Sequence, residues 1–282
     1  MHAHGTAVGF LLLSAPLLAL LQPVPAAAQE GDGSWKNVAE LTMVHAAGNA
    51  TASTFGFKNT FDYRWADSAF QLSAGGVRAR AGTVTRTATG TPDDFTVTKS
   101  TETTTTAENY FLRSRLDRTV SDALFLFGSV GWERNTFAGV QNRYTLVAGG
   151  GRTWFDEETR RFKTDLGLTY TFQDDVVENP DVASSFGGLR ASYDYFRRLT
   201  ETTDYGSVLV ADLNLQDTED VRLNWTNSLT VAISARLALK TSYQILFDNR
   251  PALVSVPLGD GAVLTPLGKV DSVFSVAVVA NF

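Results

Sequence analysis

Apolar and polar residues alternate along most of this chain, in runs of ~9 to 14 residues separated by polar or turn-rich segments. In the clearest run, residues 55–65, aromatic side chains occupy one face and mostly polar ones, such as Lys58 and Asp62, occupy the other. A period of two is the spacing of a β-strand whose faces meet different surroundings. The pattern therefore predicts a chain built mainly of strands.

About twelve strands are predicted in this way, an even number, as is usual for barrels of bacterial outer membranes. The fold class is thus all-β, an antiparallel transmembrane β-barrel with both chain ends on the periplasmic side. The most regular runs are Thr54–Trp65, Phe162–Gln173, Arg222–Ile233 and Leu237–Asp248. The less regular ones are Trp35–His45, Ala69–Ala81, Ala107–Asp117, Ala123–Glu133, Asn142–Trp154, Ser185–Leu199, Tyr205–Gln216 and Lys269–Phe282.

The predicted connections alternate between short and long. Every second one is a short turn, and the others include the Thr-rich stretch Gly82–Thr106, the acidic stretch Asp174–Ser184 and the proline-containing stretch Asn249–Gly268. Tight turns at one end and long loops at the other are typical of an outer-membrane barrel. The short connections are Ala66-Asp67, Thr119–Asp122, Asp156–Arg160, Thr200–Thr203 and Ser234–Arg236.

The last predicted strand alternates up to the final residue, Phe282. In a membrane barrel the last strand must pair with the first so that no sheet edge stays open, and this explains strand character up to the final residue. A terminal aromatic residue after such a strand resembles the assembly signal of outer-membrane barrels. We therefore expect Phe282 to be recognised by the barrel-assembly machinery during insertion, and this strand to pair with the one that begins near Trp35.

A soluble β-sandwich or a lipocalin-like barrel is the alternative, with the apolar phase inside and the polar phase in water. Aromatic residues near strand ends, including Trp35, Trp154 and Phe247, instead suit the interfacial girdles of a membrane barrel. The alternation also changes phase near Gly75-Gly76, where a glycine bulge is predicted.

The first residues predict a secretory signal. Ala7–Leu21 is an apolar run too short to span a bilayer as a helix, and Ala26-Ala27-Ala28 supplies the small residues of a cleavage site. Cleavage is expected between Ala28 and Gln29, which gives a signal peptide over residues 1–28 and a barrel domain over residues 29–282. The segment before the apolar run carries no Lys or Arg, which departs from the usual pattern.

Composition narrows the function. The chain has no cysteine, which excludes a disulfide scaffold and any thiolate metal site. Its net charge is −6, so electrostatic attraction to the negatively charged backbone of a nucleic acid is not expected. The expected surroundings are outer-membrane lipids and lipopolysaccharide, and no cofactor is predicted.

Three stretches carry a resemblance to a known family: Phe137–Arg143, Leu146–Gly151 and Asp165–Tyr170. Together with Gly48-Asn49 and Arg190–Tyr195, they resemble the salt-induced outer-membrane protein family, an uncharacterised family of exported β-barrels. The resemblance covers most of the mature chain and implies a barrel fold, an outer-membrane location and a link to salt or envelope stress. It implies no catalytic residues.

Enzymatic candidates are few. An outer-membrane lipase or protease needs a histidine base, and His45 is the only histidine after the predicted signal. No motif places a nucleophile beside it, so an ordinary polar residue is the preferred interpretation. Two acidic groups, Asp174 to Asp181 and Asp217 to Asp220, lack the spacing of a calcium loop and are predicted to be solvated. Gly149–Gly151 precedes no helix, which makes close strand packing the better explanation than phosphate binding.

The polar phase defines the predicted lumen. Placing an Arg or Lys side chain against lipid at the bilayer midplane destabilises a barrel by ~2–4 kcal/mol. Charged side chains are therefore expected to face the interior, where they form ion pairs or contact water. About twelve strands lie between the filled interior of an eight-stranded barrel and a wide porin channel. The predicted lumen-lining residues are Lys58, Asp62, Arg64, Arg78, Arg80, Arg113, Arg115, Asp117, Glu133, Arg143, Lys163, Asp165, Arg190, Asp194, Asp212, Arg222 and Lys240.

Together these features predict a non-enzymatic, integral outer-membrane barrel with a structural or stress-related role in the envelope and a narrow or occluded lumen. A porin-like channel for small solutes or ions is the main alternative. A membrane-embedded hydrolase that uses His45 is the remote one.

Overall fold

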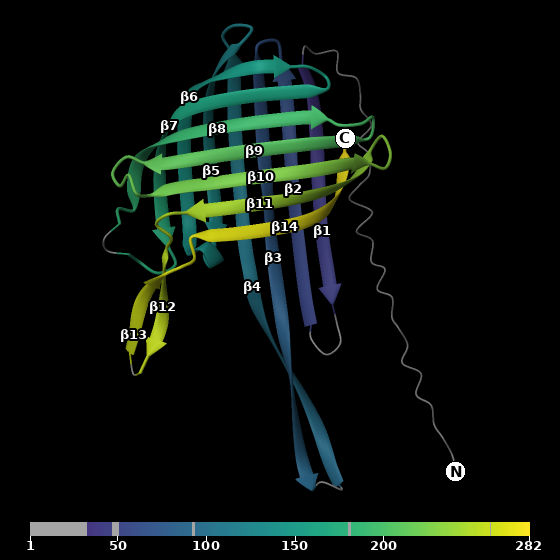
Figure 1. Ribbon diagram of the computed structural model, residues 1–282, viewed down its shortest axis with the longest axis vertical. Coiled ribbons are helices and arrows are strands. Elements are labelled where there is room, and N and C mark those ends of the chain that lie inside the picture. The colour runs from purple at the N-terminus through teal and green to yellow at the C-terminus, as the bar shows by residue number, and fades with distance from the viewer. Residues whose placement is uncertain (1–32, 47–50, 92–93, 180–181, 260) are drawn as a thin grey trace. The chain divides into compact units, whose positions relative to one another are not determined.

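The chain forms a closed antiparallel barrel. The computed structural model describes residues 33–46, 51–91, 94–179, 182–259 and 261–282, so the predicted signal peptide and its cleavage site lie outside the described residues. The barrel contains twelve strands, which confirms the predicted fold class (Figure 1). These are β1 (Gly33–Ala46), β2 (Thr51–Trp65), β3 (Ser68–Thr91), β4 (Asp94–Thr119), β5 (Leu124–Asn135), β6 (Val140–Asp156), β7 (Arg160–Asp175), β8 (Ser185–Arg198), β9 (Thr203–Asn214), β10 (Val221–Ala232), β11 (Leu237–Asp248) and β14 (Val270–Asn281).

Strands β1 and β14 close the ring. They pair antiparallel from Val38 opposite Asn281 to Leu41 opposite Val278. Beyond the last strand residue, the Phe282 backbone N–H donates to the Asn37 carbonyl at 2.9 Å, and the Asn37 N–H donates to the Phe282 carbonyl at 3.2 Å. The last residue of the chain therefore takes part in the closing seam.

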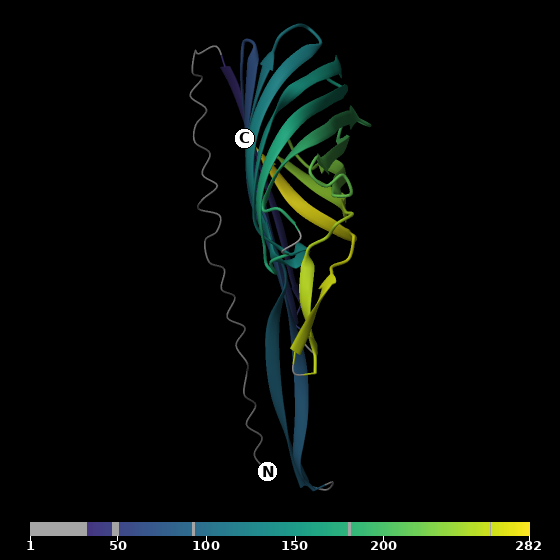
Figure 2. The ribbon, with the colours of Figure 1, turned by 90° about the vertical axis from the view of Figure 1, so that its left-hand side faces the viewer.

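The two ends of the barrel differ, as the sequence predicts. One end, here called the turn end, carries the short connections after β2, β4, β6, β8 and β10. The opposite end, the loop end, carries the longer ones, including η2 (Thr136–Ala138) and a hairpin of β12 (Leu253–Leu258) and β13 (Gly261–Pro266). At this end β3 and β4 run on as a twisted two-stranded ribbon, paired from Gly82 opposite Thr103 to Thr91 opposite Asp94 (Figure 2).

Ion pairs identify the phase that faces inward. Arg115 of β4 contacts Asp165 of β7 although β5 and β6 lie between them, and Lys240 of β11 contacts Glu40 of β1 across β14. A contact between side chains of β4 and β7, across two intervening strands, is possible only inside the ring, because side chains on the outside of a closed barrel diverge. The opposite phase is apolar and points outward, as Leu166 and Phe274, each 69% exposed, illustrate. A soluble barrel with its apolar phase inside is thus contradicted.

A small apolar core lines part of the inner wall. Phe125, Phe127 and Val147 are buried against one another there. Glycines make room for this packing: a Cβ added at Gly151 would lie 2.7 Å from Cε2 of Phe125, and one at Gly149 would lie 2.6 Å from the Gly167 Cα. The prediction that the glycine run permits close strand packing is confirmed.

The predicted bulge at Gly75-Gly76 is wrong. Pairing of β3 with β2 and with β4 is continuous there, and β3 shifts register against β4 only between Ala79 and Arg80. The two glycines instead accommodate rings, because a Cβ at Gly75 would lie 2.9 Å from the Phe111 ring and one at Gly76 would clash with Tyr110. Among the described residues, no helix has the length and hydrophobicity needed to cross a membrane.

Candidate functional site

The barrel interior gathers most of the predicted lumen residues. Arg115, Asp165, Glu40 and Lys240 face the interior, and residues directly opposite each other in an antiparallel pair lie on the same face. The strand register therefore shows which residues of every other strand face inward. The predicted residues that fall on this inward phase are Lys58, Asp62, Arg64, Arg113, Arg115, Asp117, Glu133, Arg143, Lys163, Asp165, Arg190, Asp194, Asp212, Arg222 and Lys240.

Arg78 and Arg80 were predicted to line the lumen, and this prediction is wrong. Arg78 lies opposite Phe55 and Arg80 opposite Ser53, on the outward phase, and both side chains are exposed. The prediction placed them inside because it assumed a phase change at the glycines. The strand keeps its register there, and the apolar outward phase simply ends as β3 approaches the loop end.

Arg115 is the centre of one inner cluster. Its Nε donates to Oδ1 of Asp117 at 2.6 Å and its Nη1 to Oδ2 of Asp165 at 2.9 Å. The same guanidinium lies 4.1 Å from the centroid of the Phe127 ring. Asp165 is buried and also accepts a hydrogen bond from the Ser192 hydroxyl at 2.6 Å. These contacts satisfy a carboxylate that would be costly to leave unpaired.

Glu40 is the centre of a second cluster, beside the closing seam. Its Oε1 accepts from Nζ of Lys240 at 2.9 Å and lies 3.7 Å from Nζ of Lys58. Glu40 is not among the predicted lumen residues, because the alternation of its strand is irregular. Its position opposite Lys58 in the β1–β2 register is the signal that identifies it.

A third group of charges lies nearer the loop end. Glu133 accepts from Arg143 at 3.0 Å and from Arg113 at 3.5 Å. Arg190 holds Asp212 with two nearly parallel hydrogen bonds of 2.7 and 2.9 Å, the geometry that gives arginine its specificity for carboxylates. The inner wall is therefore cross-linked by charge pairs.

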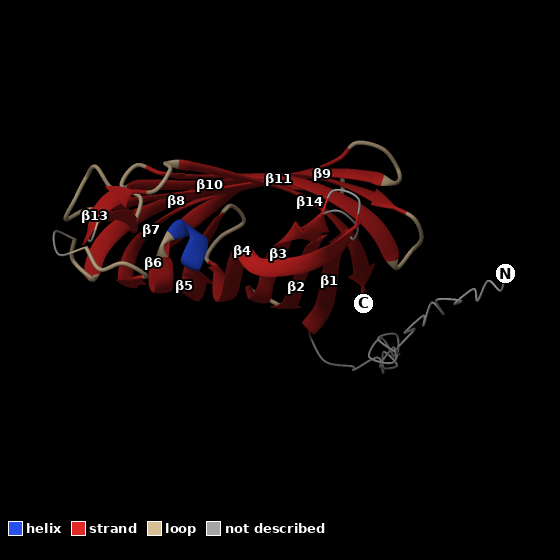
Figure 3. Cartoon of the chain, turned by 90° about the horizontal axis from the view of Figure 1, so that it is seen from below, coloured by secondary structure: helices blue, strands red, loops and turns tan. Residues whose placement is uncertain are grey.

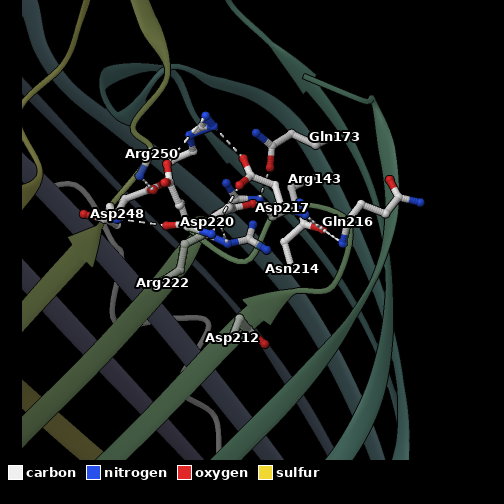
Figure 4. Close-up of polar contacts among 12 residues, drawn as sticks. Arg143, Gln173, Asp212, Asn214, Gln216, Asp217, Asp220, Arg222, Asp248 and Arg250 are labelled. Carbon is white, nitrogen blue, oxygen red and sulfur yellow. Dashed lines mark hydrogen bonds and ion pairs between the residues drawn. The ribbon is translucent and has the colours of Figure 1, made fainter. Parts of the chain in front are cut away.

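The mouth of the barrel at the loop end carries a further set of polar contacts, shown in Figure 4. We call Asn214, Asp217, Asp220, Arg222, Asp248 and Arg250 the mouth cluster. Arg250 pairs with Asp217 at 2.7 Å, and its backbone N–H donates to Asp248. Arg222 lies 3.4 Å from Asp220, and its buried Nε has no hydrogen-bond partner among the described residues.

A segment of the chain crosses part of this mouth. Residues 249–269, here called the cover segment, connect β11 to β14 and include the β12–β13 hairpin. At its base, the Leu267 N–H donates to the Ala252 carbonyl at 2.9 Å. A Cβ added at Gly139, which follows η2, would clash with the Ala252 Cβ and would lie 3.2 Å from Cδ1 of Leu267. Gly139 has φ 76°, a conformation that favours glycine.

This contact spans the mouth. Gly139 lies between β5 and β6, whereas the cover segment leaves from β11. Strands β7 to β10 separate β6 from β11 on one side of the ring, and β14 and β1 to β5 separate them on the other. Figure 3, a view onto the loop end, shows η2 within the outline of the barrel strands. The cover segment thus reaches nearly the opposite wall.

The acidic loops do not form a metal site in the part of the chain that the structure describes. Asp217 and Glu219 face Arg250, at 2.7 and 3.9 Å, and Asp175 accepts from Gln173 at 2.7 Å. Asp181, from the other predicted acidic group, lies outside the described residues.

His45 lies opposite Ser53 in the β1–β2 register, and its side chain is outside the described set.

Aromatic residues form a girdle on the outer wall near the turn end. Trp154 stacks on Phe162 with ring centroids 6.4 Å apart, and its indole N–H donates to Thr164 at 2.9 Å. Nearby, the Trp225 indole N–H donates to the Tyr193 hydroxyl at 2.9 Å. An amphipathic aromatic band of this kind suits a boundary between apolar and aqueous surroundings.

Solved structures with similar folds include several barrels. The NanC porin is 9% identical, with a TM-score of 0.45, over 88% of this chain and 98% of that one. The translocator domain of the autotransporter NalP from Neisseria meningitidis is 12% identical, with a TM-score of 0.42, over 90% of each chain. The COG4313 outer membrane channel from Pseudomonas putida F1 is 12% identical, with a TM-score of 0.42, over 93% of this chain and 100% of that one.

Sequence comparison places the chain in an uncharacterised family, as the resemblance noted above implied. Its relative in Escherichia coli (strain K12), the uncharacterized protein YdiY, is 24% identical over 145 residues. The alignment covers 51% of this chain and 55% of the relative, so the chain spans about half the length of that relative. A family model matches residues 39–255, and the chain belongs to that family, which is described as "Protein of unknown function, DUF481".

Proposed function

We propose that this chain is an integral β-barrel of the bacterial outer membrane, with its turn end toward the periplasm. The outward phase supports this location, because it presents apolar side chains around the ring, far more than a soluble protein leaves exposed. The aromatic girdle and the contrast between short turns and long loops support the orientation.

Within that membrane the barrel acts as a closed, non-enzymatic structural protein rather than as an open pore. The observation that carries this proposal is the cover segment, which reaches from β11 to Gly139 across the loop-end mouth. Beneath it, the inner charge pairs, such as Arg115 with Asp165, further narrow the interior. A structural role is also consistent with the ion pairs inside the barrel, which cross-link strands that are not neighbours.

Conductance in a planar bilayer tests this proposal. The purified wild-type chain is expected to produce no stable current steps at moderate voltage, and a porin inserted in the same bilayer provides the positive control. Regular, long-lived steps from the wild-type chain would overturn the closed-barrel proposal.

A variant without the cover segment sharpens the test. β11 and β14 already pair at Phe247 opposite Val270, and the Asp248 N–H donates to the Lys269 carbonyl, so residues 249–268 can be replaced by a two-residue Asn-Gly turn. This variant is expected to gain small steps because the mouth is uncovered. If it folds and stays silent, the cover segment is not what closes the barrel.

A narrow channel is the second candidate. The observation that favours it is two uncharged hydrogen-bonded pairs on the inner wall, in which Gln244 donates to Asn224 and Ser73 donates to Thr60. Such side chains can line water. Current steps whose ion selectivity changes in Arg143→Gln would support this candidate, whereas Arg78→Gln, on the outer wall, is the matched control.

Two further points remain proposals. The family resemblance implies a link to salt or envelope stress, and the expected result is a rise in the amount of this protein when cells grow in high salt. The first residues imply an exported precursor, and N-terminal sequencing of the mature protein is expected to begin at Gln29.

A further inference from the structure

The outer wall carries an apolar hollow near the turn end. It has a volume of about 730 Å³ and extends over the outward faces of β5 to β9. Strand register aligns its lining in rows: Leu126, Gly150, Leu166, Ala191 and Ala211 lie directly opposite one another on successive strands. Large and small side chains thus alternate from Leu126 to Ala191, and Ala211 adds a second small side chain beyond Ala191.

This alternation produces two shallow lanes. Gly150 forms the floor of one lane between Leu126 and Leu166, and Ala191 forms the floor of the next lane beyond Leu166. Leu166 is 69% exposed and forms the ridge between them. Two apolar lanes beside one ridge fit a ligand with two hydrocarbon chains.

A cation lies at the turn-end side of the hollow. Arg152 stands in the next row, opposite Leu124 and Thr164, and its guanidinium lies 4.5 Å from the centroid of the Trp154 ring. Among the described residues, no carboxylate lies within ion-pairing distance of Arg152. The charge is therefore available at the level of the aromatic girdle, where the headgroups of a bilayer begin.

We propose that this hollow binds one phospholipid of the periplasmic leaflet, with its phosphate on Arg152 and its two acyl chains in the lanes beside Leu166. The inference rests on the proposed membrane location, with the turn end toward the periplasm. Because the cation lies at the turn end, the phospholipid of the inner leaflet fits this hollow better than the lipid A of the outer leaflet. An unpaired guanidinium recognises the phosphate, and the anionic phosphatidylglycerol offers no ammonium group to compete with it.

Lipid binding to the folded full chain in detergent, measured by native mass spectrometry, tests the proposal. The probes are phosphatidylglycerol, phosphatidylethanolamine, diacylglycerol and lipid A. The wild-type chain is expected to retain a single phosphatidylglycerol, and to retain diacylglycerol, which has no phosphate, at least several-fold less well. Arg152→Gln should weaken phosphatidylglycerol binding about tenfold, as the loss of a charge-assisted contact predicts.

Two glycine variants separate the hollow from the rest of the outer wall. A Cβ at Gly150 meets only ordinary contacts, of 3.5 Å and longer, so Gly150→Leu fills a lane without a backbone clash. Gly128 has no heavy atom within 4 Å of an added Cβ, and Gly128→Leu adds the same side chain elsewhere on β5. Only Gly150→Leu should abolish retention. Arg118→Gln, at the turn end of β4 and outside the hollow, is the control for charge and should bind like the wild-type chain.

Heat-modifiable migration of each sample shows whether the barrel has folded. If the wild-type chain does not fold in detergent or vesicles, the proposed membrane location fails. If it folds, the lipid proposal is overturned by equal retention of diacylglycerol, by preference for lipid A, or by unchanged binding in both Arg152→Gln and Gly150→Leu.

Discussion

At the scale of single residues, the interior depends on a few charged side chains with several partners each. Alternation alone predicts that Arg115 and Asp165 face inward, but not that they meet, because their strands are not neighbours. Glu40 was not predicted to face inward because its strand alternates irregularly, and its contact with Lys240, two strands away in the ring, could not be predicted either. Sequence patterns identify a face, whereas contacts across the interior need the closed ring.

Arg115→Met is expected to destabilise the barrel by ~1–3 kcal/mol, because it leaves the buried Asp165 carboxylate with only the Ser192 hydroxyl as a described hydrogen-bond donor. Urea unfolding in lipid vesicles measures this change. Arg113→Met is the matched control, since the Arg113 side chain is 54% exposed and its contact to Glu133 is longer, at 3.5 Å. Equal losses in the two variants would contradict the role assigned to Asp165.

At the scale of elements, the strands and short turns were predictable because each strand carries its own alternation and each turn interrupts it. The β12–β13 hairpin was not predicted, since Asn249–Gly268 contains prolines and little alternation. The Thr-rich stretch Gly82–Thr106 was predicted as a long connection, and it forms part of the β3–β4 ribbon. The register of β3 was misjudged because glycines that accommodate the rings of Phe111 and Tyr110 resemble bulge glycines in sequence.

Deletion of Phe282 is expected to impair closure, because it removes both backbone hydrogen bonds to Asn37 as well as the terminal aromatic ring. The fraction of protein that shows heat-modifiable migration in isolated outer membranes should fall several-fold. Phe282→Tyr keeps the backbone pairing and an aromatic ring, and should assemble like the wild-type chain. Normal assembly of the deletion variant would show that the seam does not need its last residue.

At the scale of the whole barrel, the asymmetry of the two ends is the basis of the proposed orientation, in which the loop end faces outward from the cell. The chain has no cysteine, so single cysteines can report the orientation without a background signal. Thr98→Cys lies in the β3–β4 ribbon beyond the loop end, and Asp67→Cys lies in the turn between β2 and β3.

Intact cells treated with a membrane-impermeant maleimide should label Thr98→Cys and leave Asp67→Cys unlabelled, because the loop end is proposed to face outward. Lysed cells should label both variants, which controls for accessibility of the thiol. The reverse pattern in intact cells would contradict the proposed orientation.

The ion pair between Glu40 and Lys240 joins β1 to β11 over the strand that completes the ring. Until β14 has docked, β1 and β11 are not held side by side, and the Glu40 carboxylate lacks its closest cation. Lys58 of the neighbouring strand β2 already contacts Glu40 before closure, so the open seam leaves Glu40 with one cation and closure adds the second and closer one. Closure of the ring and formation of the Glu40–Lys240 pair are therefore one event, and an insertion intermediate with an open seam lacks the stabilisation that this pair gives the finished barrel.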